Sequence, residues 1–454
     1  MISEHRTNIK KSRYNLTVPT CVADVRIVYN TLQDSLTLVK GTSFDSDEIL
    51  QLYKQGVYVN QDIDERLVYR YRLNSQKYSG KRLHLFLTIT GLCNCDCQYC
   101  FAKDSFPQHS IKQSDISYIM RFIETQIVDN GIRKLNIDFF GGEPLICEDI
   151  YLTLMNQIST LAEKSHVTVE YQFYTNGTLR PRNGYSIFDG YPNVKFLITI
   201  DGLQAVHDSL RPMKTGESSY EAIFRNLKEL KSNEKKAVIR INFGKKNIEN
   251  IPELLDNIIE SGLNCFPIEF YPIQNMSCGS ADYSDAVDLQ SLPRMSNFIW
   301  NEAAKRHISV GLRPTSACCY CTAFTNKMFV IDPDLNVYKC ALLQCDRKNS
   351  IGNLKKNTDF LRDSVFYEWM AYDPSLEDKC NECVALPVCS GGCGGSGTFR
   401  FGSHKHSNCY DLSPEMLKNR ISYYASQRYS NVIENFAKTN TNILVLEKAA
   451  YPIP

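Results

Sequence analysis

The chain has 454 residues, more than one ordinary hydrophobic core accommodates, so two or three domains are expected. Its 51 Lys and Arg residues balance 50 Asp and Glu residues, which excludes a strong net field that would draw it to nucleic acid or to an anionic membrane. Its 18 cysteines fall mainly into three groups, 93–100, 318–345 and 380–409, and such clustering is what metal ligation requires.

Nothing in the sequence predicts export or membrane insertion. The chain begins MISEHRTNIKKSRYN, without the apolar core of a signal peptide, and no apolar run is long enough to span a bilayer. We therefore expect a cytoplasmic protein with neither a membrane nor a nucleic acid as partner. In a reducing cytosol disulfides are rare, so clustered cysteines indicate metal binding or catalysis.

Residues 1–80 predict a small α+β extension. Val25–Asn30 and Ser35–Gly41 form an expected hairpin, Ser43–Ser46 opens a helical stretch, and a short strand and a second helix over Ile63–Leu73 follow. Small strand-and-helix additions of this kind resemble the leader-peptide recognition elements of peptide-modifying enzymes. A packing extension that closes the mouth of the next domain fits the same pattern, and the sequence leaves both open.

Residues 81–305 predict an α/β domain in which strand-like runs alternate with amphipathic stretches. The six runs are Leu83–Thr90, Lys134–Phe140, Val167–Tyr174, Val194–Ile200, Ala237–Phe243 and Phe266–Tyr271. The amphipathic stretches include Ile116–Val128, Ile150–Ala162 and Tyr220–Leu230. Such alternation indicates right-handed βαβ units and a parallel sheet. Six strands are too few for a closed eight-stranded barrel.

A cysteine-rich loop, residues 91–101, directly follows the first of these strands. Cys93, Cys97 and Cys100 are spaced C-x3-C-x2-C. A 4Fe-4S cluster normally takes four thiolates, so three ligands within one short loop leave one iron open for a small molecule. Zinc sites favour two separated pairs of ligands, and this loop offers a fourth only if Cys95 is recruited. Ligands of parallel sheets bind at the carboxyl ends of the strands, where this loop lies.

The loop resembles the signature of the radical S-adenosylmethionine (radical SAM) superfamily. The resemblance implies an open, partial (β/α)6 TIM-like barrel in which Cys93, Cys97 and Cys100 form the catalytic centre and hold a 4Fe-4S cluster that chelates SAM. It also assigns SAM contacts at successive strand ends: Tyr99 to adenine, the Gly141-Gly142-Glu143-Pro144 segment to the amino group, Arg211 to the carboxylate, and further roles to Asn176, Thr199, Asp201, Arg240 and Asn242. Singly, each of these residues would be interpreted as a turn or a solvated charge.

A second cysteine pattern lies in residues 306–425. Cys380-x2-Cys383-x5-Cys389-x3-Cys393, followed by Cys409, resembles the SPASM domain, an iron-sulfur domain with two auxiliary 4Fe-4S clusters. The resemblance implies three clusters in all. The ligands of the first auxiliary cluster would be Cys318, Cys321, Cys340 and Cys393, with Cys319 competing for the place of Cys318; those of the second would be Cys380, Cys383, Cys389 and Cys409. A zinc ribbon built on Cys380 to Cys393 is the alternative.

Two further expectations concern the C-terminal half. Leu335 stands where the SPASM pattern usually has glycine in the turn before Cys340, and we expect Asn336 to take the positive φ instead, since Asn tolerates it better than other non-glycine residues. Residues 426–454 form a predicted C-terminal tail that contains a short strand at Ile443–Leu446.

Together these patterns predict a radical SAM oxidoreductase that acts on a peptide or protein. The resemblance implies a ribosomally made precursor peptide with a leader as partner, and an external reductant such as flavodoxin or ferredoxin. The leading hypothesis is a peptide maturase that forms a thioether or carbon-carbon crosslink. An anaerobic sulfatase maturase, which forms formylglycine, and a peptide epimerase are alternatives. Sulfatase maturases carry an aspartate directly after the second auxiliary cysteine, where this chain has Ala341. The non-enzyme alternative is an iron-sulfur electron carrier or a zinc scaffold, which would need no SAM pocket.

Replacing Cys93, Cys97 and Cys100 together with alanine should abolish formation of 5'-deoxyadenosine and leave the auxiliary iron in place, because each cysteine group satisfies its own metal. After anaerobic reconstitution, the wild type should hold about twelve irons per chain and the variant about eight. Iron content and reductive SAM cleavage are measured on the same samples. Retained cleavage in the variant would refute the assigned centre, and tightly bound zinc without iron would refute an iron-sulfur enzyme.

Overall fold

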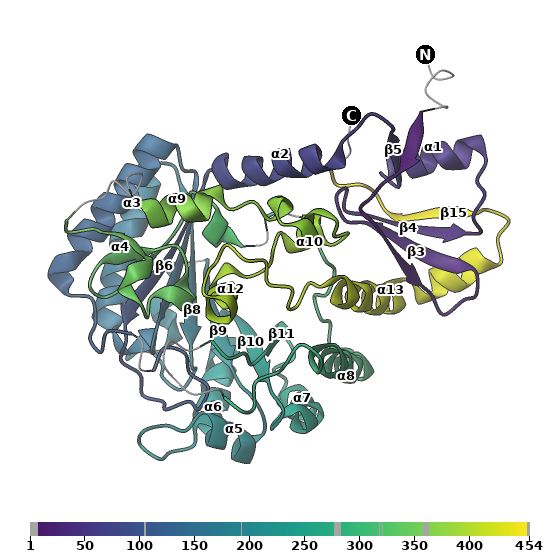
Figure 1. Ribbon diagram of the computed structural model, residues 1–454. Helices are drawn as coiled ribbons and strands as arrows, with labels where there is room; N and C mark the ends of the chain where they lie inside the picture. Colours follow the sequence, from purple (N-terminus) through teal and green to yellow (C-terminus); the bar gives the residue numbers. More distant parts are fainter. Residues whose placement is uncertain are drawn as a thin grey trace.

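The structure is a computed structural model that describes residues 8–103, 106–191, 193–276, 283–316, 318–319, 321–356 and 363–451. Within these residues the strands form a nine-stranded, a four-stranded and a two-stranded sheet. Figure 1 shows the large sheet with its helices at one side of the molecule and the four-stranded sheet at the other. None of the helices in the described residues is both long and apolar enough to cross a membrane.

Six parallel strands in chain order form the main part of the large sheet. They are β6 (Arg82–Thr90), β7 (Lys134–Gly141), β8 (Thr168–Thr175), β9 (Val194–Thr199), β10 (Lys236–Phe243) and β11 (Ile268–Pro272). Each lies within two residues of the bounds predicted from the sequence, so the expected parallel α/β sheet is confirmed. All six carboxyl ends therefore meet at one edge, where a ligand site is expected.

Helices connect these strands and cover the outer face of the sheet (Figure 1). They are α3 (Ile116–Asn130), α4 (Glu148–Lys164), α5 (Gln204–Leu210), α6 (Ser219–Ser232), α7 (Ile251–Glu260) and α8 (Leu292–Lys305). Short 3-10 turns lie between elements: η2 (Gln113–Asp115), η3 (Pro144–Ile146), η4 (Tyr185–Phe188) and η5 (Ile248–Asn250). The predicted helices over residues 116–128, 150–162 and 220–230 are confirmed.

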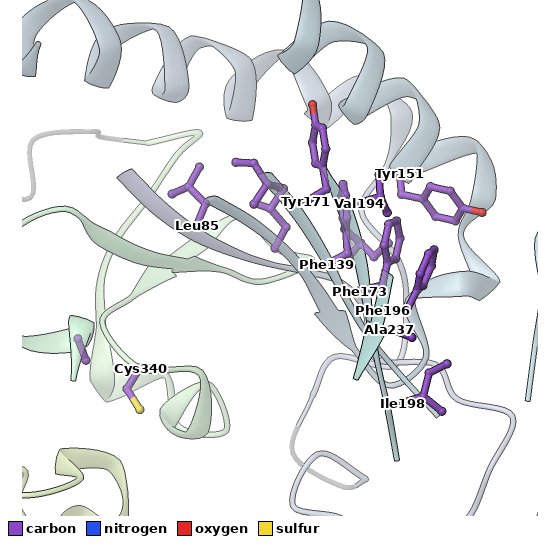
Figure 2. Close-up of a cluster of buried hydrophobic side chains, with 14 of the residues drawn as sticks. Leu85, Phe139, Tyr151, Tyr171, Phe173, Val194, Phe196, Ile198, Ala237 and Cys340 are labelled. Atoms are coloured by element: carbon purple, nitrogen blue, oxygen red, sulfur yellow. The ribbon is translucent and has the colours of Figure 1, made fainter. Parts of the chain in front are cut away.

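The main core lies between the sheet and these helices. Figure 2 shows Phe139, Phe173 and Phe196 of neighbouring strands in a row, and their ring centroids are 4.7 and 5.4 Å apart. All three rings are fully buried, and each contributes roughly 1.5–3 kcal/mol to stability by leaving water. Because successive strand residues point to opposite faces, Phe140 and Tyr174 are directed to the inner face of the sheet. The alternation thus separates the residues that hold the fold from those that line the interior.

The cysteine-rich segment extends the same sheet. Strand β12 (Met328–Ile331) pairs in parallel with β6, and β13 (Asn336–Tyr338) and β14 (Ser350–Asn353) continue from it in antiparallel register. Short helices and turns follow or intervene: η6 (Thr322–Phe324), η7 (Ala341–Leu343), η8 (Arg347–Asn349), α9 (Ser364–Ala371), η10 (Pro374–Leu376), α10 (Asp378–Asn381), α11 (Leu386–Cys389) and α12 (Gly394–Phe401). The auxiliary segment is therefore joined to the barrel through backbone hydrogen bonds.

The expectation for the turn between β12 and β13 was wrong. Leu335 itself takes the positive φ, at 64°. Asn336 is held in the strand because its backbone N–H and its Nδ2 donate to the Asp332 carboxylate at 2.8 and 2.9 Å. The Leu335 side chain is fully buried in the main core, and this burial offsets the backbone strain of about 1–2 kcal/mol.

The N-terminal segment forms the second sheet together with the end of the chain. Its strands are β2 (Asn15–Pro19), β3 (Val25–Asn30) and β4 (Ser35–Lys40), and β15 (Ile443–Glu447) pairs with β4 at the edge. The hairpin, the strand and the two helices predicted here are present: α1 (Ser46–Lys54), β5 (Tyr58–Asn60), which pairs with β1 (Ile9–Lys11), and α2 (Glu65–Tyr78). In Figure 1, α2 runs toward the barrel and α13 (Pro414–Ala437) lies beside the sheet.

Glu447 fastens the C-terminal strand β15. Its carboxylate accepts hydrogen bonds from the hydroxyls of Tyr424 and Tyr429 at 2.6 and 2.8 Å and from the Arg313 guanidinium. Burial alone would raise the pKa of Glu447, but these three donors lower it below its ordinary value. A carboxyl group whose pKa is lowered by folding stabilises the folded state above its unfolded pKa, and the contribution is lost as the pH falls through the folded value.

Glu447→Gln should therefore weaken β15 by about 1–3 kcal/mol at pH 7, and the difference from wild type should shrink below about pH 4. Hydrogen exchange of the β15 and β4 amides measures this local opening. The matched control is Glu434→Gln, an exposed position on α13, which should leave exchange unchanged at both pH values. Equal protection of wild type and Glu447→Gln at pH 7 would show that the carboxylate does not hold the strand.

Candidate functional site

A cavity of about 330 Å³ lies at the carboxyl ends of the parallel strands. Its walls include eleven of the residues singled out from the sequence: Cys93, Cys97, Tyr99, Cys100, Gly141, Gly142, Asn176, Thr199, Arg211, Arg240 and Asn242. These residues come from five different strand ends, so the topology alone brings them together. Glu143, Pro144 and Asp201 are not among the residues that line the cavity.

Three of the four cysteines of the loop, Cys93, Cys97 and Cys100, line the cavity. The backbone N–H of Cys95 and the side-chain amide of Asn176 point to the Cys93 sulfur at 3.4 and 3.7 Å. A hydrogen bond from the Cys95 thiol, together with these two donors, lowers the pKa of Cys93 to about 6. Burial raises the pKa of Cys97 to about 11 and raises that of Cys100 as well. Cys93 is therefore the thiol that most readily becomes a thiolate.

These thiols fit the ligand chemistry of an iron-sulfur cluster. Within the part of the chain that the structure describes, no three Cys, His, Asp or Glu side chains are already gathered closely enough to hold a metal ion. The cysteines that line the cavity nonetheless offer three thiols, and thiolates are the ligands that 4Fe-4S clusters use. Three such donors in the lining of one cavity, together with amide and hydroxyl groups, suit a cluster that keeps one iron open.

The two adjacent glycines are required by the cysteine loop. A Cβ at Gly141, whose φ is 142°, would lie 2.1 Å from the carbonyl oxygen of Thr90, and a Cβ at Gly142 would lie 2.3 Å from that of Leu92. The Gly142 and Glu143 amides donate to these same two carbonyls at 2.9 and 2.8 Å. The glycines thus permit a close approach of backbone to backbone, which fixes the start of the loop.

Glu143 lies behind the cavity wall and positions it. The side chain is fully buried and accepts from the Leu145 amide at 3.0 Å, the Thr175 hydroxyl at 2.8 Å and the Asn176 amide at 2.7 Å. Burial raises its pKa to about 7, although these hydrogen bonds oppose the rise. The carboxylate therefore joins the end of β7 to that of β8, and it holds Asn176 where its side chain reaches Cys93. Pro144 begins the 3-10 turn η3 behind it.

Asp201 is likewise a positioning residue in this structure. It has no exposed surface and accepts from the Asn242 amide at 2.8 Å and from the Tyr99 hydroxyl. The same hydroxyl accepts from Arg211 Nη1 at 2.6 Å and from Asn242 Nδ2 at 3.1 Å. This network fixes the Tyr99 ring, which was expected to contact adenine, on the cavity wall. Arg211 lies 3.6 Å from the Asp201 carboxylate and is thereby partly neutralised.

Sequence reasoning missed part of the wall. Tyr174, Tyr271 and Phe140 line the cavity from the inner face of their strands, and Gln274 and Leu342 complete it. The strand alternation could have identified the three aromatic residues, because they share the face opposite to the buried core positions. No local pattern marks Leu342, which comes from the cysteine-rich segment and reaches the barrel only through the β6–β12 pairing.

The cysteines predicted for the second auxiliary cluster lie near one another. Burial raises the pKa of Cys389, and the neighbouring Cys409, Cys380 and Cys383 raise it further. Burial also raises the pKa of Cys380 to about 11 and that of Cys383, with Cys409 adding to both. The four thiols therefore lie within electrostatic range of one another, and their assignment to one cluster stays a prediction.

In the first auxiliary set, Cys321, Cys340 and Cys393 influence one another, and Cys318 and Cys319 compete for the fourth place. Burial raises the pKa of Cys340, and Cys393 and Cys321 add to the rise. Cys318 has a positive φ of 51°, and its sulfur lies 3.7 Å from the Ser316 hydroxyl. The Cys319 sulfur instead lies 3.5 Å from the Cys321 carbonyl oxygen. These contacts favour Cys319 over Cys318, the residue preferred from the sequence, as the fourth ligand.

Comparison with known proteins agrees with this geometry. Residues 87–258 match the radical SAM superfamily. The chain is 24% identical over 341 residues to the serine-type anaerobic sulfatase-maturating enzyme of Klebsiella aerogenes, and the match covers 71% of this chain and 82% of that enzyme.

Two solved structures share the fold. Native anSMEcpe with bound AdoMet and Kp18Cys peptide has a TM-score of 0.61 at 18% identity, and the match covers 78% of this chain and 99% of that chain. Streptococcus suis SuiB bound to precursor peptide SuiA has a TM-score of 0.54 at 15% identity, and the match covers 88% of this chain and 98% of that chain. The predicted fold class, a partial (β/α)6 barrel with a C-terminal SPASM-type domain, is confirmed.

Glu143→Gln should destabilise the strand ends at the cavity by about 1–3 kcal/mol. The NH2 of the new side-chain amide would face backbone N–H groups whose hydrogen bonds the carboxylate now accepts. Hydrogen exchange at Asn176 and Leu145, together with urea unfolding, measures the effect. Glu163→Gln is the control, because Glu163 is exposed on helix α4, which follows Glu143 in the chain. This variant should change stability by less than about 0.5 kcal/mol. If both variants match the wild type, the Glu143 carboxylate does not hold the two strands together.

Proposed function

Since this chain belongs to the radical SAM superfamily, we propose that it is a maturase that installs a thioether or carbon-carbon crosslink in a ribosomally made peptide. Members of this superfamily bind SAM and a 4Fe-4S cluster. When bound at Cys93, Cys97 and Cys100, these groups would supply a 5'-deoxyadenosyl radical that abstracts hydrogen from an unactivated carbon. The three thiols and the amide and hydroxyl groups that line the cavity beside them support this assignment.

The observation that carries the proposal is the joint construction of the cavity by the barrel and the cysteine-rich segment. Leu342 lines the cavity and stands two residues after Cys340, a predicted ligand of the first auxiliary cluster. Crosslink formation by a carbon radical must release one electron, so an electron acceptor close to the substrate is needed. A cluster held at Cys340 would lie beside the cavity wall, which supports crosslinking over a reaction that needs no acceptor.

The residues around the cavity have separate tasks in this proposal. Asn176, Thr199 and Asn242 present amide and hydroxyl groups that suit the polar parts of SAM. Phe101 stacks on Phe140 with ring centroids 6.2 Å apart and closes the apolar side of the cavity. An apolar wall limits water near the reacting atoms, which protects a reactive intermediate.

The comparisons also support a peptide as substrate. The chain shares its fold with SuiB, whose solved structure holds the precursor peptide SuiA, and with anSMEcpe, whose solved structure holds the Kp18Cys peptide. The two matches cover 98% and 99% of those solved chains. We therefore propose a precursor peptide with a leader as the partner, and an external flavodoxin or ferredoxin as the reductant. The small N-terminal sheet is the candidate region for leader binding.

Sulfatase maturation is the second candidate. The 24% identity to the Klebsiella aerogenes enzyme, which spans most of both chains, favours it. Formylglycine formation requires a base to remove the proton of the substrate's hydroxyl or thiol group. Ala341, directly after Cys340, cannot supply that base where sulfatase maturases place an aspartate. The crosslinking proposal therefore takes precedence. Epimerisation is the third possibility and would require a thiol that returns a hydrogen atom.

Mass spectrometry of a co-expressed precursor peptide should show a loss of two hydrogens and no fragmentation between the joined residues. The double variant Cys380→Ala/Cys383→Ala should retain SAM cleavage but yield no crosslinked peptide, because loss of the second auxiliary cluster leaves the first, beside the cavity, without a route to pass the electron on. Cys265→Ala, an exposed cysteine outside all three groups, is the matched control and should behave as the wild type.

Other products would identify other reactions. A product that reacts with a hydrazide contains an aldehyde and would establish formylglycine formation. An unchanged mass with one deuterium gained from heavy water would establish epimerisation. Either result would overturn the proposed crosslinking.

A further inference from the structure

Two guanidinium groups line the cavity, and they differ in their surroundings. Arg211 follows helix α5, and Arg240 lies on the inner face of strand β10. Each carries a fixed positive charge, since arginine stays protonated in proteins. A cation in a partly enclosed cavity is costly unless an anion accompanies it. Each of the two arginines therefore needs an anion that compensates its charge.

Arg211 lies at the end of the cavity formed by the cysteine loop and already has partners. It donates to the Tyr99 hydroxyl at 2.6 Å and lies 3.6 Å from the Asp201 carboxylate. The amides of Asp96 and Gln98 in the cysteine loop donate to the carbonyls of Pro212 and Leu210 at 2.8 and 3.0 Å, which places Arg211 beside the loop that carries the thiols. Arg211 is therefore the cation next to the expected binding end of the SAM amino acid group.

Arg240 lies on β10 beside β11 and has no ion pair within 4.0 Å among the described residues. Its guanidinium carbon stands 4.1 Å above the centre of the Tyr271 ring and 5.8 Å from that of Tyr174. Its Nε is buried and lacks a hydrogen-bond partner in the described part of the chain. Glu269 is opposite Arg240 in the β10–β11 register, yet no ion pair within 4.0 Å joins them. The guanidinium is thus held over the Tyr271 ring and hydrogen-bonds to the Tyr271 side chain, while its buried Nε has no acceptor among the described residues.

The number of carboxylates on SAM indicates which molecule Arg240 binds. SAM carries a single carboxylate, and Arg211 is the arginine beside the loop where that group would bind. A second anion must then come from the other molecule in the cavity, the substrate. A guanidinium fork fixed by stacking is suited to a carboxylate, because it can donate two parallel hydrogen bonds.

We propose that Arg240, held by Tyr271 and Tyr174, binds a carboxylate of the peptide substrate and so selects peptides that carry an acidic residue or the C terminus close to the modified carbon. This inference rests on the proposed function, and it reassigns a residue that the sequence pattern gave to the cofactor. Arg240 is then a specificity-determining residue. Its carboxylate partner would also fix the peptide relative to the cluster end of the cavity.

The test uses reconstituted holoenzyme saturated with SAM and a library of short random peptides with one central cysteine. Peptides retained by the wild type should be enriched in Asp or Glu over Asn or Gln by about tenfold at one position. Arg240→Met should abolish that enrichment while the Kd for SAM stays within about twofold of the wild type. Arg240→Lys, which keeps the charge but loses the fork, should keep a smaller enrichment. The matched control is Arg225→Met, an exposed position on α6.

Three results would overturn the inference. Arg240→Met could weaken SAM binding about tenfold or more, in which case the residue serves the cofactor. Acid enrichment could persist in Arg240→Met, or the wild type could show none. If Arg240→Met does not fold, Arg240→Lys decides, because an enrichment equal to that of the wild type would exclude the guanidinium fork. Peptides that are modified without a preference for acidic residues would contradict only this inference. SAM cleavage with no peptide bound or modified would also contradict the proposed function.

Discussion

The position of the cysteine loop depends on one close contact between backbones. In it, Gly141 and Gly142 pack against the carbonyls of Thr90 and Leu92. The cysteine loop has no regular structure of its own, so it depends on the neighbouring strand end for its shape. Two backbone hydrogen bonds and the absence of two Cβ atoms hold the loop against β7. Any side chain at either glycine would push the loop away from the sheet and disperse the three thiols.

Buried carboxylates extend this constraint along the carboxyl edge of the sheet. Glu143 joins the end of β7 to that of β8, and Asp201 joins the loop after β9 to β10 and to Tyr99. Both side chains are completely buried, so each would be costly without its hydrogen bonds. Their role is to hold the groups that face the cavity. The acidic residues in this sequence pattern thus act behind the wall, and the amides, hydroxyls and one stacked arginine act in front of it.

The auxiliary segment is bound to this arrangement through the sheet. Strand β12 adds to β6 in parallel and β13 runs back antiparallel to β12, so the cysteine-bearing turn after β13 leaves the sheet at the amino end of β6. From this turn Leu342 reaches the cavity. The N-terminal segment contacts the auxiliary segment as well, since the buried Lys77 donates to the Met370 and Tyr372 carbonyls and the Thr31 hydroxyl donates to that of Val384.

The sequence by itself determined the six strands of the barrel, their helices and the identity of most residues at the cavity. The reason is that these features are local: strand alternation, amphipathic periodicity and cysteine spacing are all set by neighbours along the chain. Residues such as Cys93, Asn176 and Asn242 could be placed at one site because parallel strands end at one edge.

Only the tertiary structure decided which of these residues face the cavity and which support it. Glu143 and Asp201 are turned away because backbone donors from distant strands satisfy them, and no pattern along the chain shows that. The pairing of β15 with β4 and the positive φ of Leu335 also depend on long-range packing. A buried side chain can hold a strained backbone and a remote strand can complete a sheet, since packing free energy is gained between residues that the sequence separates.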